Sequence, residues 1–198
     1  LWLGEKAGLG APLLQGWLAG ERGLWRRYGP SLGIGFLAGL AVGLALSALS
    51  AMPVLLLPLE GDLGRVEQIY ARLTPLKGLG GSLMAGITEE VWFRLGLMTL
   101  IVFVLNWLLG RRQTTAGVAW LSNLLAVLPF GLLHLTNVSA IGAPINLATT
   151  ALVVVLNGAA GIVFGYLYWR RGLETAMLAH FSMDVVLHVL APMVFTAL

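Results

Sequence analysis

The chain lacks cysteine altogether and is poor in charged residues. Only 11% of its 198 residues are charged, whereas a soluble domain carries about 25%. Without cysteine there is no disulfide framework, no thiolate nucleophile and no cysteine-based metal site. So little polar surface cannot coat a water-facing globule. The composition therefore argues against a soluble enzyme, a disordered tail and a nucleic-acid-binding domain, and no nucleic-acid partner is expected.

What the chain has instead is long apolar sequence. Hydrophobic residues make up 58% of it, and there are 26 glycines. Five apolar runs each approach or exceed the roughly 20 residues that cross a bilayer as a helix. They are residues 31–59, 81–109, 115–137, 144–168 and 173–198. We predict an all-α, polytopic helical membrane protein with about five transmembrane helices. Residues 31–198 form one membrane domain that contacts membrane lipids.

Residues 1–30 have a different character. They mix tryptophans such as Trp2, Trp17 and Trp25 with charged residues, a pattern typical of an amphipathic helix that lies in the membrane interface. We therefore predict an interfacial N-terminal segment, separate from the membrane domain.

The basic residues outside the apolar runs indicate the orientation. If the N-terminus is cytoplasmic, eight basic residues lie inside and three outside, which agrees with the positive-inside rule. The eight are Lys6, Arg22, Arg26, Arg27, Arg111, Arg112, Arg170 and Arg171, and the three are Arg65, Arg72 and Lys77. A cytoplasmic N-terminus is therefore predicted.

Glycines recur at four-residue spacing in two of the apolar runs. Gly35, Gly39 and Gly43 form one stripe, and Gly161 and Gly165 form another. Such small-residue stripes let transmembrane helices approach closely, so both runs are predicted to pack tightly against a neighbour.

Seven ionisable residues fall inside the apolar runs. An ionisable group at the bilayer centre costs roughly 2.5–3.5 kcal/mol even on lenient scales. Seven such groups are too costly to scatter against lipid, and we expect them to converge on a shared polar interior. They are Glu89, Glu90, Arg94, His134, His180, Asp184 and His188.

Glu90 and Arg94 are four residues apart, so they share a helix face and can pair. Glu89 is rotated by about 100° from Glu90 on the helix and has no cation in its own helix. Arg94 would then hold Glu90 ionised, while Glu89 carries out general acid–base chemistry. The alternative is that all three residues only tie helices together.

His180 and Asp184 are also four residues apart and present an imidazole and a carboxyl on one face. Such a pair can bind a metal, hydrogen-bond a polarised carbonyl, or form a local ion pair only. His134 closes the third run, and His188 extends the His180 stripe by four more residues. Either one can equally serve as a hydrogen-bonding link between helices.

Three motifs now stand in order on separate apolar runs: Glu89-Glu90-x-x-x-Arg94, Phe130-x-x-x-His134 and His180-x-x-x-Asp184. Together they resemble the CPBP family, the CAAX prenyl protease and bacteriocin-processing (Abi-type) intramembrane endopeptidases. The resemblance covers about residues 80–190. It implies a hydrolase that cleaves a peptide or protein substrate, and in some family members this substrate is lipid-modified. We expect the membrane to be a prokaryotic cell membrane.

The resemblance also implies roles for the residues. Glu89 and His134 would activate the attacking water, His180 and Asp184 would stabilise the oxyanion, and Glu90 and Arg94 would position the site. Many family members have asparagine where this chain has Asp184, which favours a role for Asp184 in orienting His180 or in binding a metal.

The cofactor stays open at this stage: either none, or one divalent metal such as zinc. The alternative of a zinc-dependent intramembrane metalloprotease would use Glu89, His134, His180 and Asp184 as its metal ligands. Two further classes compete with the enzyme, a proton-coupled membrane transporter and a non-catalytic membrane scaffold. The sequence favours no particular oligomeric state.

The predicted spans place the candidate residues at different depths. Glu89 lies about 13 Å from one membrane boundary and His180 about 12 Å from the other, at the helical rise per residue. His134 lies near the end of its span. The three can meet if the third span extends to about Ala140, if the fifth begins outside the membrane, or if the helices tilt strongly.

Overall fold

The computed structural model describes residues 2–56, 74–140, 142 and 144–195, with no side chains described for residues 50–56 and 195. All regular secondary structure in these ranges is helical. Five helical rods within them are long and apolar enough to cross a membrane, as the sequence predicted. The protein is therefore an integral membrane protein with an all-α fold.

The five rods include helices that continue directly into one another. The first is α3 (Leu24–Leu56). The second joins α5 (Pro75–Glu90), η1 (Val91–Met98) and α6 (Thr99–Leu108), and the third joins α7 (Ala116–Leu133) and α8 (Leu135–Ala140). The fourth is α9 (Leu147–Arg171), and the fifth joins α10 (Leu173–Val185), η2 (Val186–Leu190) and α11 (Ala191–Phe195).

The rods begin and end at somewhat different residues from those predicted. The first begins at Leu24, not at residue 31, because the long side chains of Arg26 and Arg27 reach solvent from an exposed first turn. The second begins at Pro75, where proline suits the first helical turn and the Thr74 hydroxyl accepts a hydrogen bond from Lys77 N at 3.3 Å.

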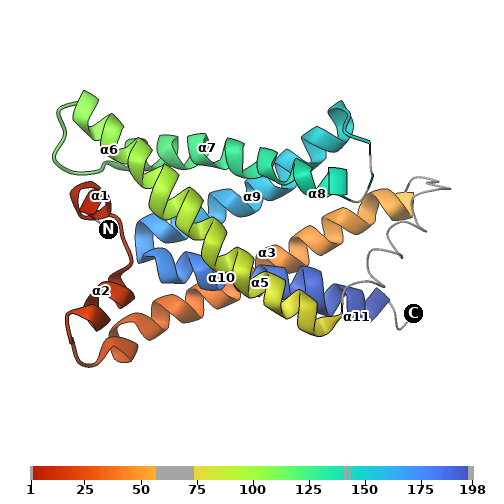
Figure 1. The fold of residues 1–198 in the computed structure, drawn as a ribbon, viewed down its shortest axis with the longest axis horizontal. Helices are drawn as coiled ribbons and strands as arrows, with labels where there is room; N and C mark the ends of the chain where they lie inside the picture. The colour runs from red at the N-terminus through yellow and green to blue at the C-terminus, as the bar shows by residue number, and fades with distance from the viewer. Residues whose placement is uncertain (1, 57–73, 141, 143, 196–198) are drawn as a thin grey trace.

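The N-terminal segment forms two short helices rather than the single amphipathic helix predicted. These are α1 (Trp2–Ala7) and α2 (Pro12–Leu18). Gly8 separates them with a backbone φ of 67°, a conformation that favours glycine. In Figure 1 this segment covers one end of the bundle, next to the ends of α6 and α9.

Two hydrogen bonds fasten the N-terminal segment to the turn between α9 and α10. Leu173 N donates to the Gly10 carbonyl at 2.9 Å, and Leu14 N donates to the Glu174 carboxylate at 2.7 Å. Gly172 sits against the Pro12 ring with no room for a Cβ. The segment is therefore a docked part of the fold, although α2 still exposes Trp17 and Leu18 to its surroundings.

The first glycine stripe lies where α3 crosses α10. A Cβ on Gly35 would collide with the Thr175 carbonyl, and one on Gly39 would collide with the Ala179 carbonyl and the Ser182 hydroxyl. The Ser182 hydroxyl in turn donates to the Phe36 carbonyl at 3.0 Å. Because glycine has no side chain, the two backbones come close enough for a hydrogen bond between α3 and α10.

The second stripe lies where α9 meets α7. Gly161 packs against Val127 and Phe130, and Gly165 packs against Asn123, whose amide donates to the Ile162 carbonyl at 2.9 Å. This contact fixes α7 and α9 together beside the charged residues described below.

The rod α5–η1–α6 runs obliquely across the other helices in Figure 1. The third rod extends to Ala140, so His134 lies inside it rather than at its end. The side chains of His134 and His180 both lie within 4.0 Å of the Glu89 carboxylate, so the difference in depth expected from the sequence is absent.

Two segments of π-helix lie next to the candidate catalytic residues. η1 begins directly after Glu90, and η2 begins at Val186, two residues after Asp184, and contains His188. At the end of η1 the Thr99 hydroxyl donates to the Arg94 carbonyl at 3.0 Å. Such departures from the α-helix are frequent at functional sites.

We expect Gly39→Leu to destabilise the protein by about 1–3 kcal/mol or more, because the side chain would force α3 away from α10. Thermal unfolding in detergent measures the effect. Gly33→Leu is the matched control, since Gly33 lies on the same helix and a Cβ there would meet open space. Equal stability of the two variants would contradict this account of the α3–α10 contact.

Candidate active site

A cavity of about 520 Å³ lies between the rods, and the candidate residues line it. Glu89 reaches it from α5, His134 from the junction of α7 and α8, and His180 and Asp184 from α10. His188 lines the same cavity from η2. The structure thus brings together side chains from three rods that the sequence singled out separately.

Glu90 and Arg94 form the buried base of the site. Arg94 Nε lies 3.2 Å from Glu90 Oε2, and each side chain has at most 2% of its surface exposed. Arg94 Nη2 also donates to the Gly161 carbonyl at 3.0 Å. The buried guanidinium thus pairs with Glu90 in its own rod and links that rod to α9 through the bond to the Gly161 carbonyl.

Aromatic rings surround this ion pair. The Arg94 guanidinium lies over the Phe130 ring at 4.5 Å and near the Phe164 ring at 5.7 Å. Phe164 in turn stacks on the His180 imidazole, with ring centroids 4.8 Å apart and planes 19° apart. The rings exclude lipid and water from the buried charges and support the cation by cation–π attraction.

His180 is held by Glu90 from the neighbouring rod. Its Nδ1 lies 2.8 Å from Glu90 Oε1. Because a carboxylate only accepts, Nδ1 carries the proton and Nε2 is directed toward Glu89 and Asp184. Glu90 therefore forms an ion pair with Arg94 and a hydrogen bond with His180, and the hydrogen bond fixes the orientation of the imidazole.

His134 is oriented by its own helix. Its Nδ1 lies 2.9 Å from the Phe130 carbonyl, which only accepts, so Nδ1 again carries the proton. The His134 and Phe130 rings also contact each other, with centroids 4.9 Å apart. The Nε2 atom of His134 is left to face Glu89.

Glu89 lies next to both the His134 and the His180 imidazole. Its Oε2 lies 3.8 Å from His134 Nε2 and 4.0 Å from His180 Nε2. Among the described residues, no group donates a hydrogen bond to this oxygen, although it is buried. Glu89 thus presents a carboxylate oxygen to both histidines without a fixed hydrogen bond.

Asp184 lies on the far side of His180 from Glu90. Its Oδ2 is 3.7 Å from His180 Nε2 and 3.9 Å from His188 Nδ1. The side chain of Asp184 is almost fully buried, whereas that of His188 is about half exposed. His188 therefore belongs to the rim of the cavity, next to the Asp184 carboxylate.

This arrangement can be set beside known proteins. A family model described as type II CAAX prenyl endopeptidase, Rce1-like, matches residues 71–186, more than half of the chain. The chain belongs to this family. The resemblance seen in the sequence is thereby confirmed. Comparison with curated proteins finds no match, and comparison with solved structures finds none either.

Membership makes this protein a CAAX endopeptidase of the membrane, and thus a protease that acts on a peptide or protein substrate. The matched residues contain all three motifs, from Glu89 to Asp184. His188 lies just beyond them and is a feature of this chain outside the match.

The donor set of this CAAX endopeptidase does not fit a metal ion as it is arranged. Within the described ranges, no three His, Asp or Glu side chains have a geometry that can hold one. The Glu89–His134, Glu89–His180 and His180–Asp184 pairs stand 3.7–4.0 Å apart. Ligands of tetrahedral zinc at about 2.0–2.1 Å from the metal would stand closer together.

Several residues that build the site were not identified from the sequence. Phe164 stacks on His180, the Gly161 carbonyl binds Arg94, and Asn137 and Asn157 line the cavity. The glycine stripe indicated that Gly161 packs tightly. Nothing in the sequence distinguishes Phe164 from the other apolar residues of its helix.

We expect Arg94→Ala to destabilise the protein by about 3–5 kcal/mol, because it leaves Glu90 buried without its cation. Thermal unfolding in detergent measures the loss, with Arg112→Ala in an exposed loop as the control. The double variant Glu90→Met/Arg94→Met should recover part of the stability, since both charges are removed. An Arg94→Ala protein as stable as the control would contradict the role of the ion pair.

Proposed function

We propose that this protein hydrolyses a peptide bond of a membrane-associated peptide or protein, with the attacking water activated by Glu89 and His134. The observation that carries the proposal is the position of Glu89, whose carboxylate faces the Nε2 atoms of two oriented imidazoles across one cavity. The family of CAAX endopeptidases supports the same class of reaction.

The first step uses the gap between Glu89 and His134. A single water can bridge atoms 3.8 Å apart with two ordinary hydrogen bonds. The Glu89 carboxylate takes one proton from this water as general base, while His134 Nε2 accepts the other hydrogen bond and orients the nucleophile. The water oxygen then forms a bond to the scissile carbonyl carbon, and the carbonyl oxygen becomes an oxyanion.

The oxyanion is stabilised by His180. As an imidazolium, His180 donates from Nδ1 to Glu90 and presents a second N–H at Nε2 toward the cavity. Its charge is balanced by Glu90 and Asp184 on its two sides. This assigns Asp184 to the orientation of His180, and His180 to the developing negative charge.

The second step completes the hydrolysis. Protonated Glu89 returns its proton to the leaving amine nitrogen, the carbon–nitrogen bond breaks, and the oxyanion collapses to a carboxylic acid. The products are a new carboxyl terminus and a new amino terminus, and Glu89 is again a carboxylate. Glu90 and Arg94 take no part in proton transfer and serve as positioning residues for His180.

The family name points to substrates with a lipid-modified carboxyl-terminal segment, which the exposed apolar rods would meet within the bilayer. Residues 1–30 serve as an interfacial segment beside the membrane domain of residues 31–198. We further propose a cytoplasmic N-terminus, which the distribution of basic residues supports, and a prokaryotic cell membrane as the location of the protein.

We expect Glu89→Gln to lower peptide cleavage by at least about 100-fold, the scale of a lost general base, while the unfolding temperature changes little. Cleavage is measured on a library of membrane-associated and prenylated peptides with purified protein. Glu21→Gln, an exposed carboxylate, is the matched control. Full cleavage by Glu89→Gln, or by both His134→Ala and His180→Ala, would contradict the proposal.

We also expect cleavage to persist in the presence of a strong chelator, because the described arrangement does not fit a metal ion. Elemental analysis is made on the same sample. Stoichiometric zinc, together with activity that chelation removes and added zinc restores, would replace this mechanism with a zinc-dependent one that uses the same residues.

A further inference from the structure

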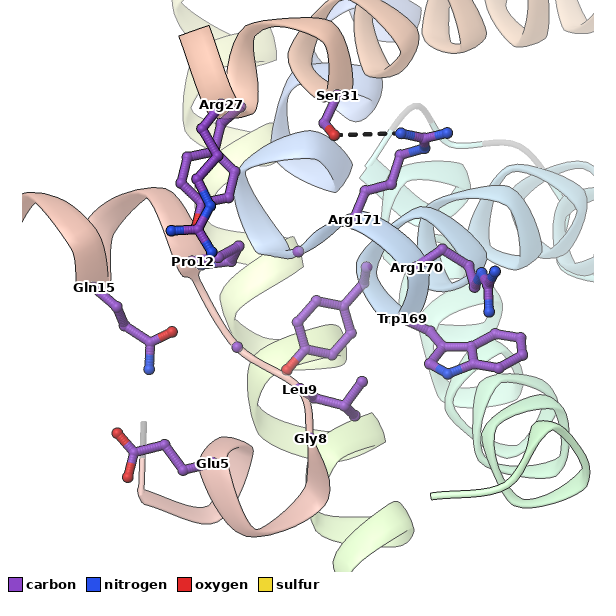
Figure 2. Close-up of a pocket in the computed structure, with 14 residues that line it drawn as sticks. Glu5, Gly8, Leu9, Pro12, Gln15, Arg27, Ser31, Trp169, Arg170 and Arg171 are labelled. Atoms are coloured by element: carbon purple, nitrogen blue, oxygen red, sulfur yellow. Dashed lines mark hydrogen bonds between the residues drawn. The ribbon is translucent and has the colours of Figure 1, made fainter. Parts of the chain in front are cut away.

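A second cavity lies at the other end of the bundle from the π-segment η2, between the N-terminal segment and the ends of α3 and α9. Its volume is about 560 Å³. Figure 2 shows it framed by Arg27 and Ser31 from α3, by Arg170 and Arg171 from α9, and by the chain that joins α1 to α2. None of these residues has a part in the proposed hydrolysis.

The charge of this basic cavity is predominantly positive. Among the described residues that line it, three are arginines and one, Glu5, is acidic. Arg27 also forms an ion pair with Glu21 at 3.2 Å, so the positive charge rests mainly on Arg170 and Arg171. Arg171 donates to the Ser31 hydroxyl at 3.3 Å, and Arg170 lies over the Trp169 ring at 5.2 Å. Neither Arg170 nor Arg171 forms an ion pair within the described ranges, so both guanidinium groups have donors available for an anion.

The wall of the basic cavity is fixed by the fold. Tyr168 lines it and is almost fully buried, with its hydroxyl 2.6 Å from that of Thr99. On the opposite side, the chain from Gly8 to Pro12 is fastened to the α9–α10 turn by the bond from Leu173 N to Gly10 O. The arginines are therefore presented around a preformed hollow.

The location indicates what kind of anion would enter. The apolar spans Leu24–Leu49 and Leu147–Arg171 respectively begin and end at this cavity. Because the ends of apolar spans lie at the membrane boundary, we expect the cavity at the level of the lipid headgroups. Trp169 lines it and Trp17 is exposed on the adjacent α2, as is usual for aromatic residues at the interface. Clusters of arginine at this depth attract the phosphate groups of anionic lipids.

We propose that the basic cavity binds the headgroup of an anionic phospholipid, with the phosphate held by Arg170 and Arg171 and approached by Arg27. The ligand chemistry is a phosphate group, and the source is a bilayer lipid rather than a free phosphate. The exposed Leu14, Trp17 and Leu18 of α2 provide apolar surface at the same level for the acyl chains.

Native mass spectrometry of the full chain, released from nanodiscs of mixed phosphatidylglycerol and phosphatidylcholine, tests this proposal. We expect retained phosphatidylglycerol to exceed phosphatidylcholine, and Arg170→Gln/Arg171→Gln to lower its affinity by about fivefold per arginine. The matched control is Arg111→Gln/Arg112→Gln, an exposed arginine pair in the loop between α6 and α7 and outside the cavity lining. Arg170→Lys/Arg171→Lys should retain most of the binding, because the charge remains.

Three results would overturn the proposal. Equal loss of phosphatidylglycerol in the two glutamine pairs would indicate surface charge without a site. Equal retention of the two lipids by the parent protein would indicate no headgroup selectivity. Displacement of the lipid by soluble glycerol phosphate would assign the cavity to a free phosphate. If Arg170→Gln/Arg171→Gln does not fold, the same comparison is made with Arg27→Gln, whose side chain is exposed.

Discussion

The burial of Glu90 between Arg94 and His180 is the interaction on which the site depends. A carboxylate that is completely buried inside a membrane protein requires compensating partners, and here it has a guanidinium at 3.2 Å and an imidazole N–H at 2.8 Å. Each partner connects Glu90 to a different rod: Arg94 is hydrogen-bonded to α9, and His180 is part of α10. Glu90 therefore ties three rods together and sets the orientation of the imidazole.

Close helix packing makes this arrangement possible. The glycines of α3 let its backbone approach α10, and those of α9 let it approach α7. Both contacts lie beside the cavity, so the positions of His180 and His134 follow from small residues that carry no chemistry themselves. Phe130 and Phe164 then fill the space around the charges and keep them apart from lipid.

The fold was largely predictable from the sequence, because membrane-spanning segments are read from hydropathy and length alone. The seven charged or titratable residues in apolar runs were also predictable, since each carries a known cost in lipid.

The contact between Glu90 and His180 could not be predicted, because the two are 90 residues apart and no spacing rule relates them. The π-segments were missed too, since η1 and η2 have no composition that separates them from α-helix. The docking of α1 and α2 onto the α9–α10 turn depends on backbone bonds that a hydropathy pattern does not encode.

The most direct test of the role of Glu90 is the protonation of His180 Nδ1, measured by nitrogen-15 NMR of the histidine-labelled protein in lipid. The account predicts a protonated Nδ1 in hydrogen-bond contact with a carboxylate, whether His180 is neutral or charged, and loss of that signature in Glu90→Leu. A bare Nδ1, with the single proton of a neutral ring on Nε2, would contradict it, because His180 would then not be held by Glu90.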